Sequence, residues 1–188
     1  MNKTKLKVIV VIFSLVIVAG IIYSNIPSKN DKTSKNDKTI NTAHADWTEH
    51  YEDFKSLKEN SDLIINGKKV DSYTEQRVDL IFTKEIIEVN KAYYGDLKEG
   101  SKIEILQTGG TLNNIVTEPL EEAPILDKNN NYLLFLKSTP EGHYLILGGY
   151  QGVGSIKNNK IIFDKHNDKI FKELKDKSLN DIENLIIE

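Results

Sequence analysis

The longest apolar run of this chain lies at its start. Residues 8–23 read VIVVIFSLVIVAGIIY and carry no charge. A helix of this length rises about 24 Å, close to the roughly 30 Å hydrocarbon core of a membrane. Lys3, Lys5 and Lys7 precede the run, and such flanking charge keeps the N-terminus in the cytoplasm. We therefore predict an N-terminal signal anchor, a single transmembrane helix, within residues 1–27.

Removal of this segment as a signal peptide is the alternative. Ala43-His44-Ala45 has the small-x-small form of a cleavage site, but it lies about 20 residues beyond the apolar run, too far for an ordinary signal peptide. We favour the uncleaved anchor. The protein is then single-pass in the cell membrane with its C-terminal domain outside, and it is secreted if the segment is cleaved.

A polar segment follows the apolar run. Residues 28–39 read SKNDKT twice and contain no apolar side chain. Such a segment cannot bury enough surface to offset the entropy lost on ordering. We predict a flexible stalk over residues 28–45 and a folded extracytoplasmic domain over residues 46–188. Attraction of the stalk lysines to anionic lipid or wall polymers is the alternative role, which the two aspartates weaken.

Short apolar runs at close spacing dominate the domain, and no helical pattern separates them. This spacing predicts an antiparallel barrel or sandwich. The runs lie at residues 63–65, 78–83, 86–89, 103–106, 132–136, 144–147, 153–156 and 161–163.

Helical spacing marks both ends of the domain. In residues 46–60, Trp47, Tyr51, Phe54 and Leu57 share one helical face, with Asp46 as the expected N-cap. Residues 170–174 form a short amphipathic stretch, and Ser178 with Asp181 resembles a capping box for a last helix. The predicted fold class is mainly β with flanking helices (α+β).

The charge differs sharply between the two parts of the chain. The net charge is −3, from 25 basic and 28 acidic residues. Residues 1–45 hold seven lysines and two aspartates, which is +5, so residues 46–188 hold 18 basic and 26 acidic residues, which is −8. Nucleic-acid binding depends on clustered Lys and Arg. The acidic domain, with Arg77 as its single arginine, therefore argues against a nucleic-acid partner.

The chain contains no cysteine. Its absence excludes disulfides, a thiol nucleophile, a cysteine zinc site and a lipid anchor on cysteine. The histidines also lack metal-ligand spacing. Asp164, His166 and Asp168 alternate and could share a metal, but a polar hairpin exit is the favoured interpretation.

A second alternating set resembles the start of a calcium loop. Asp127, Asn129 and Asn131 have the spacing, but Tyr132 and Ser138 stand where such a loop needs glycine and glutamate. We interpret this stretch as a polar turn. The sequence therefore predicts no metal, no cofactor and no catalytic residue.

Two glycine-containing segments are the candidates for a contact surface. Residues 148–154 read GGYQGVG, but no helix pattern follows, as a phosphate loop would require. We expect a bend that presents its polar residues at the surface. The predicted binding rim comprises Gln107, Thr108, Gly109, Gly110, Thr111, Tyr150 and Gln151.

The order of these motifs resembles a known class of domain. Residues 61–70, SDLIINGKKV, are similar to the opening strand of bacterial cell-surface proteins with an OB-fold of the netrin-like, metalloproteinase-inhibitor type. The resemblance covers roughly residues 61–157. It also includes the segments IIEV at 86–89, YGDLKEG at 94–100, IEI at 103–105, NYLLFL at 131–136 and the glycines at 148–149.

This resemblance implies an OB-like antiparallel β-barrel. Inhibitors of that type use an N-terminal cysteine to chelate the metal of their target and disulfides to hold the scaffold. This chain has neither, so the resemblance carries over no site residue and no inhibitory mechanism.

Together these features predict a membrane-anchored extracytoplasmic binding or structural module, held in the membrane by residues 8–23 and facing a surface or exported protein partner. The alternatives are a cell-wall-directed hydrolase using a carboxylate pair and a modulator of an exported protease.

Overall fold

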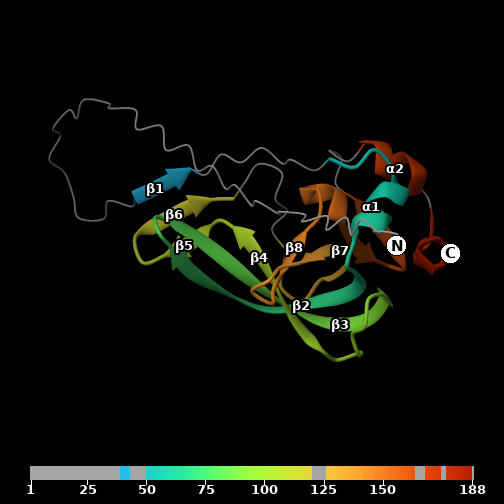
Figure 1. Ribbon diagram of the computed structural model, residues 1–188, viewed down its shortest axis with the longest axis horizontal. Coiled ribbons are helices and arrows are strands. Elements are labelled where there is room, and N and C mark those ends of the chain that lie inside the picture. The colour runs from blue at the N-terminus through green and yellow to red at the C-terminus, as the bar shows by residue number, and fades with distance from the viewer. Residues whose placement is uncertain (1–38, 43–49, 120–125, 164–167, 175–176, 188) are drawn as a thin grey trace, which may run out of the picture.

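The computed structural model describes residues 39–42, 50–119, 126–163, 168–174 and 177–187 (Figure 1). The fold is mainly β with helices at its flanks, as the sequence predicts. The helices are α1 (Phe54–Asn60), the 3-10 helix η1 (Gly149–Gly152), α2 (Asp168–Leu174) and α3 (Leu179–Ile187). The strands are β1 (Thr39–Thr42), β2 (Leu63–Arg77), β3 (Leu80–Tyr94), β4 (Lys102–Thr108), β5 (Gly110–Leu112), β6 (Ile115–Glu118), β7 (Asn131–Ser138), β8 (Tyr144–Ile146), β9 (Val153–Lys157) and β10 (Lys160–Phe163).

The predicted membrane segment, residues 8–23, and the stalk up to residue 38 lie outside the described residues. Among the helices of the described residues, none combines the length and the apolar character needed to cross a membrane.

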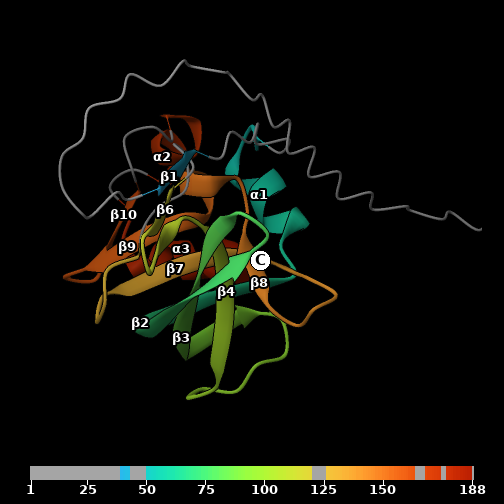
Figure 2. The ribbon, with the colours of Figure 1, turned by 90° about the vertical axis from the view of Figure 1, so that its left-hand side faces the viewer.

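Five strands form a ring that closes on itself. Hydrogen bonds link β7 to β2, β2 to β3, β3 to β4 and β4 to β8, and β8 pairs back onto β7. Each pairing is antiparallel except that of β4 with β8, where Ile105 lies opposite Tyr144 in a parallel contact. Beyond the ring, β9 pairs with β7 and β10 pairs with β9, so the sheet continues to one side (Figure 2).

The hairpin of β2 and β3 is the largest element of the ring. Both strands contain 15 residues. Asn66-Gly67 lies inside β2, at a bulge in the pairing with β3. A Cβ on Gly67 would stand 2.5 Å from the Cγ2 atom of Ile87. The missing side chain therefore lets the strands approach here rather than turning the chain.

Two hydrophobic cores lie on opposite sides of the ring strands. Successive residues of a strand point to opposite faces, so Ile64 and Ile65 enter different cores, as do Leu134 and Phe135. The inner core comprises Leu63, Ile65, Ile87, Val89, Ile103, Ile105, Leu126, Tyr132, Leu134, Leu136, Ile146 and Val153. The outer core comprises Tyr51, Phe54, Leu57, Ile64, Leu133, Phe135, Leu147, Phe163, Ile170, Leu174, Ile182 and Ile186, and it holds the three α-helices against the sheet.

The first helix of the domain is shorter than the sequence predicts. It begins at Phe54 rather than after Asp46, because Asp53 is the N-cap and forms a capping box with Ser56. The Asp53 side chain accepts a hydrogen bond of 2.7 Å from the Ser56 backbone N–H. At the other end of the domain the predicted capping box is confirmed, with Ser178 Oγ accepting from the Asp181 N–H at 3.2 Å.

A small second sheet has the order β1-β6-β5. β1 lies within the segment predicted as stalk and pairs in parallel with β6, with Ile40 opposite Val116. The stretch before β1 has no apolar residue, whereas Thr39–Thr42 offers one isoleucine between β-prone threonines. Part of the predicted stalk is therefore a strand of the domain.

Candidate binding face

The predicted rim divides into two separate places. Its first part, Gln107–Thr111, runs from the end of β4 into β5, where Gly109 and Gly110 have φ of 114° and 142°. Thr108 lies opposite Phe82 in the sheet. A Cβ on Gly109 would stand 2.7 Å from the backbone of Pro119. The glycines therefore serve a tight backbone crossing between β4 and β5.

The second part of the rim serves the fold as well. Gln151 in η1 is 4% exposed, so the prediction that it is presented at the surface is wrong. Its side-chain Oε1 accepts from the Tyr51 N–H at 2.8 Å, and its Nε2 donates to the Tyr51 carbonyl at 2.9 Å. The amide thus satisfies both buried backbone groups of Tyr51 and fixes the chain that enters α1. Tyr150 beside it is half-buried.

The two parts do not form one surface. Gln151 is fastened to the segment that precedes α1, whereas Thr111 belongs to β5. Figure 1 shows α1 and β5 toward opposite ends of the domain. The binding role of these residues as a single rim therefore has no support in their placement.

The outer side of the β2–β3 hairpin gathers polar and aromatic side chains instead. We call this surface the hairpin face. Because neighbours across a sheet share a face, the register places Tyr73 opposite Lys84 and Glu75 opposite Phe82. The hairpin face comprises Tyr73, Glu75, Arg77, Phe82, Lys84 and Glu104. Thr108, opposite Phe82, joins its border and connects it to the first part of the predicted rim.

Lys84 stands between two carboxylates on this face. Its Nζ lies 3.3 Å from Glu75 Oε2 and 3.4 Å from Glu104 Oε2. The other oxygen of each carboxylate is also used: Arg77 Nε donates to Glu75 Oε1 and Tyr73 OH donates to Glu104 Oε1 at 2.8 Å. The five side chains therefore restrain one another.

Aromatic rings lie under both cations. The guanidinium carbon of Arg77 is 5.6 Å from the centre of the Phe82 ring, and Lys84 Nζ is 5.6 Å from the centre of the Tyr73 ring. These distances permit cation–π attraction. The long side chains of the hairpin face are thus ordered before any ligand arrives, which reduces the entropy cost of binding.

The charges of this face also set its protonation. Desolvation pushes the pKa of Glu75 upward, but the hydrogen bonds and charges of Arg77 and Lys84 outweigh it and lower the pKa. For Lys84, desolvation is likewise outweighed by its two carboxylate partners, which raise its pKa. Glu75 and Lys84 therefore both carry their charges at neutral pH.

This arrangement bears on the hydrolase alternative. Glu75 and Glu104 are carboxylates close to each other, as such an enzyme needs. A general acid also needs a raised pKa, whereas the pKa of Glu75 is lowered. Desolvation does raise the pKa of Glu85, against the opposing effect of Lys69, but this side chain is 2% exposed and beyond the reach of a polymer substrate.

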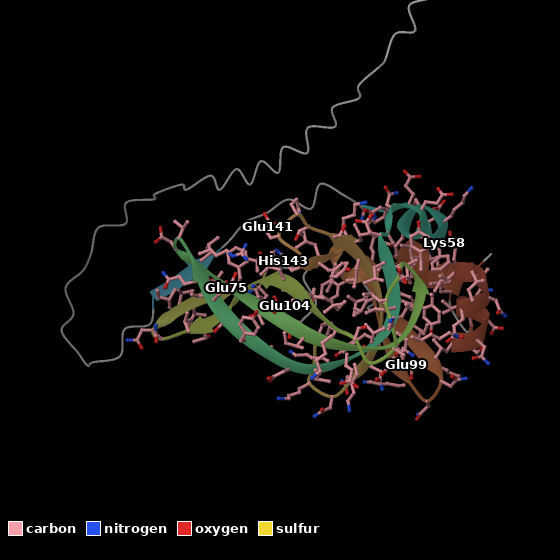
Figure 3. All side chains as sticks on the ribbon, turned by 60° about the horizontal axis from the view of Figure 1, so that its bottom comes forward. Lys58, Glu75, Glu99, Glu104, Glu141 and His143 are labelled. Carbon is pink, nitrogen blue, oxygen red and sulfur yellow. The ribbon has the colours of Figure 1, made fainter. Side chains whose placement is uncertain are left out.

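A turn beside the hairpin face brings two more titratable side chains. His143 follows the Pro140-Glu141-Gly142 turn, and its Nε2 lies 4.0 Å from Glu141 Oε2. The pairing of Ile105 with Tyr144 makes Glu104 and His143 neighbours across β4 and β8. Figure 3 shows Glu75, Glu104, Glu141 and His143 in one region, apart from Lys58 and Glu99.

The alternating motifs do not assemble a metal site within the described part of the chain, where no group of His, Asp and Glu has suitable geometry. Asp127–Asn130 forms the predicted polar turn, and the Asp127 N–H donates to Tyr132 OH at 2.7 Å. Asp164 and His166 lie outside the described residues.

Comparison of the chain with models of known protein families gives no match, and comparison with curated proteins gives no similar sequence.

The sequence shows one sign of the hairpin face, an alternation of side chains that does not enter the predicted rim. Tyr73, Glu75 and Arg77 occupy alternate positions, and so do Phe82 and Lys84. Alternation on both arms of a hairpin places all five side chains on one surface.

Proposed function

We propose that this protein is a membrane-anchored extracytoplasmic binding module built on an OB-like barrel. The anchor is the apolar segment 8–23, and the SKNDKT repeat holds the domain away from the membrane. The domain recognises a surface or exported protein partner through the hairpin face and needs no cofactor.

The closed ring supports the OB-like assignment. Numbered along the chain, the five ring strands are β2, β3, β4, β7 and β8. Around the ring their order is β2-β3-β4-β8-β7, so the fifth strand lies between the third and the fourth. A five-stranded Greek-key barrel has this kind of order, and OB-folds bind through the face of their second and third strands. Those strands are β3 and β4 here, which carry Phe82, Lys84 and Glu104. The resemblance to bacterial cell-surface domains of the netrin-like type implies the same fold, without the cysteines of that type.

One observation carries the binding function: an exposed face on which Tyr73 and Arg77 are held in place. Tyrosine and arginine are the residues that contribute most to protein interfaces. Tyr73 is 44% exposed, so its ring remains available to a partner while its hydroxyl is fixed by Glu104. The balanced charges of the face favour a partner of mixed polarity over a polyanion.

Replacing Tyr73 and Arg77 together by alanine should abolish chemical crosslinking of the protein to its partner in intact cells. The expected reason is loss of the two anchoring side chains, while the fold keeps a melting temperature close to wild type because both are exposed. The measurement is the crosslinked adduct seen with an antibody against the full chain. The matched control is Tyr94→Ala with Lys98→Ala, which removes an exposed tyrosine at the other end of β3 and an exposed cation from the loop that follows it.

Retention of the adduct in the control and its loss in the Tyr73/Arg77 variant would support the hairpin face. Adducts of equal yield in both variants would show that the partner binds elsewhere.

Protease treatment of intact cells should release the domain by cutting within residues 28–45. The expected cuts lie in the SKNDKT repeat, because a segment without apolar residues has no buried surface to hold it against a protease. Mass spectrometry of the released fragment gives the position. A stalk that resists protease in intact cells but is cut after lysis would contradict the outward orientation.

A further inference from the structure

The edge of β6 accepts a strand from far away in the sequence. Residues 39–42 of β1 pair with residues 115–118 of β6 in parallel register. β1 is the outermost strand of the small sheet, and β5 occupies the other edge of β6. The binding edge of β6 is therefore defined by a strand already seated on it.

β6 itself is firmly fixed. Thr117 is 1% exposed, and its Oγ1 accepts a hydrogen bond of 2.8 Å from the Ile81 N–H in β3. Gly110 of β5, which pairs with Thr117, packs so closely on the hairpin that a Cβ would stand 2.8 Å from Thr83 Oγ1. The edge is thus a rigid template joined to the main sheet.

β1 is held much more weakly. It has four residues, and the Ile40 side chain is 62% exposed rather than buried in a core. Among the described elements, β6 is the one with which β1 makes extensive contact. A four-residue edge strand whose isoleucine lies outside any core opens at low free-energy cost.

β1 carries none of the side chains that protect edge strands. Its sequence TINT has no lysine, no proline and no charge. Residues 43–49 join it to the domain, and seven residues can extend about 23–25 Å. A β1 that leaves its own β6 therefore stays tethered to the domain by a seven-residue connection.

We infer that two copies of this protein exchange β1, each placing residues 39–42 on β6 of the other. The exchanged pair makes the same backbone hydrogen bonds as the single copy, so the free-energy difference comes mainly from concentration and from the connecting residues. The exchange is reciprocal and gives a closed two-fold dimer. It depends on the β1–β6 pairing alone and not on the proposed function.

The absence of cysteine makes this testable. Paired strands lie about 4.8 Å apart, which suits a disulfide between opposite residues. One full-length chain carries Ile40→Cys and a differently tagged full-length chain carries Val116→Cys. The two are co-expressed, purified together, oxidised and separated on a non-reducing gel. The control replaces Val116→Cys by Glu59→Cys on α1, which Figure 1 places far from β6.

The expected result is a disulfide-linked heterodimer with the 40/116 pair, several-fold above the 40/59 control. A further variant, Ile40→Pro with Asn41→Pro, removes strand hydrogen-bond donors and should lower the dimer fraction in light scattering without changing the melting temperature of the domain.

Two outcomes overturn the inference. One is an internal disulfide in the single chain Ile40→Cys/Val116→Cys with no heterodimer above control, which shows that β1 stays with its own copy. The other is no disulfide in either format, which shows that β1 does not pair with β6.

Discussion

Replacing Lys69 by methionine should destabilise the domain by about 3–5 kcal/mol, because it leaves the buried Glu85 carboxylate without its countercharge. Lys69 and Glu85 face the interior of the ring, with exposed fractions of 7% and 2%. Their Nζ and Oε2 atoms are 2.6 Å apart, and Lys69 Nζ also donates to the Leu126 carbonyl. Chemical denaturation of wild type and Lys69→Met measures the loss.

The matched control is the double variant Lys69→Met/Glu85→Leu. An apolar pair of similar volume is often as stable as a buried ion pair, so this variant should regain most of the lost stability. Exposed ion pairs contribute less than about 1 kcal/mol to the free energy of unfolding. If Lys69→Met lowers this free energy by no more than that, the Lys69–Glu85 pair is accessible to water.

The pH dependence of this variant has a definite sign. Burial raises the pKa of Glu85 in the folded protein above its usual 4.5, although Lys69 opposes this. The folded state then binds the proton more tightly than the unfolded chain, so this group stabilises at low pH and its contribution is lost as pH rises through the folded pKa. Without Lys69 the pKa of Glu85 rises further, so protonation of this carboxyl at low pH removes the unpaired charge. The loss of folding stability caused by Lys69→Met should therefore be smaller at about pH 5 than at about pH 8.

Replacing Phe135 by alanine should cost about 3–5 kcal/mol through the cavity it leaves. Phe135 is fully buried in the outer core, where its ring meets that of Phe54 edge-on, with centres 5.7 Å apart. The strands and helices share this core, so both should unfold in one transition at lower denaturant. The measurement is chemical denaturation followed by far-UV circular dichroism and by intrinsic fluorescence.

Ile162→Ala is the control for this second result. Ile162 is 50% exposed on β10, so its loss should change stability by less than about 0.5 kcal/mol. A double-mutant cycle with Phe54→Ala should add a coupling of about 0.5–1.5 kcal/mol for the ring pair. Separate transitions for helices and strands would show that the outer core does not join them.

Local patterns allowed much of the fold to be predicted. The predicted runs at 153–156 and 161–163 are confirmed as β9 and β10, and Asn158 and Asn159 between them adopt positive φ, 50° and 60°, as a tight hairpin turn requires. The apolar strand at 132–136 is confirmed as β7. These features depend on neighbouring residues, which the sequence displays directly.

What the sequence did not reveal depends on residues that are distant along the chain. Lys69 and Glu85 lie at inward positions of β2 and β3, but charged residues are normally assigned to the solvent face, so only the pairing register identifies them as a buried pair. Gln151 was misplaced for the same reason, because its partner Tyr51 is 100 residues away. The glycines around it suggested exposure, whereas they allow a tight 3-10 turn.

The outer core has a consequence for how the chain acquires its structure during synthesis. It takes Tyr51 from before the first ring strand and Ile182 and Ile186 from α3. The ring likewise closes only when β8 reaches β4 and β7. The inner core is complete once residue 153 has been synthesised, whereas the outer core reaches its final packing only after α3 has left the ribosome.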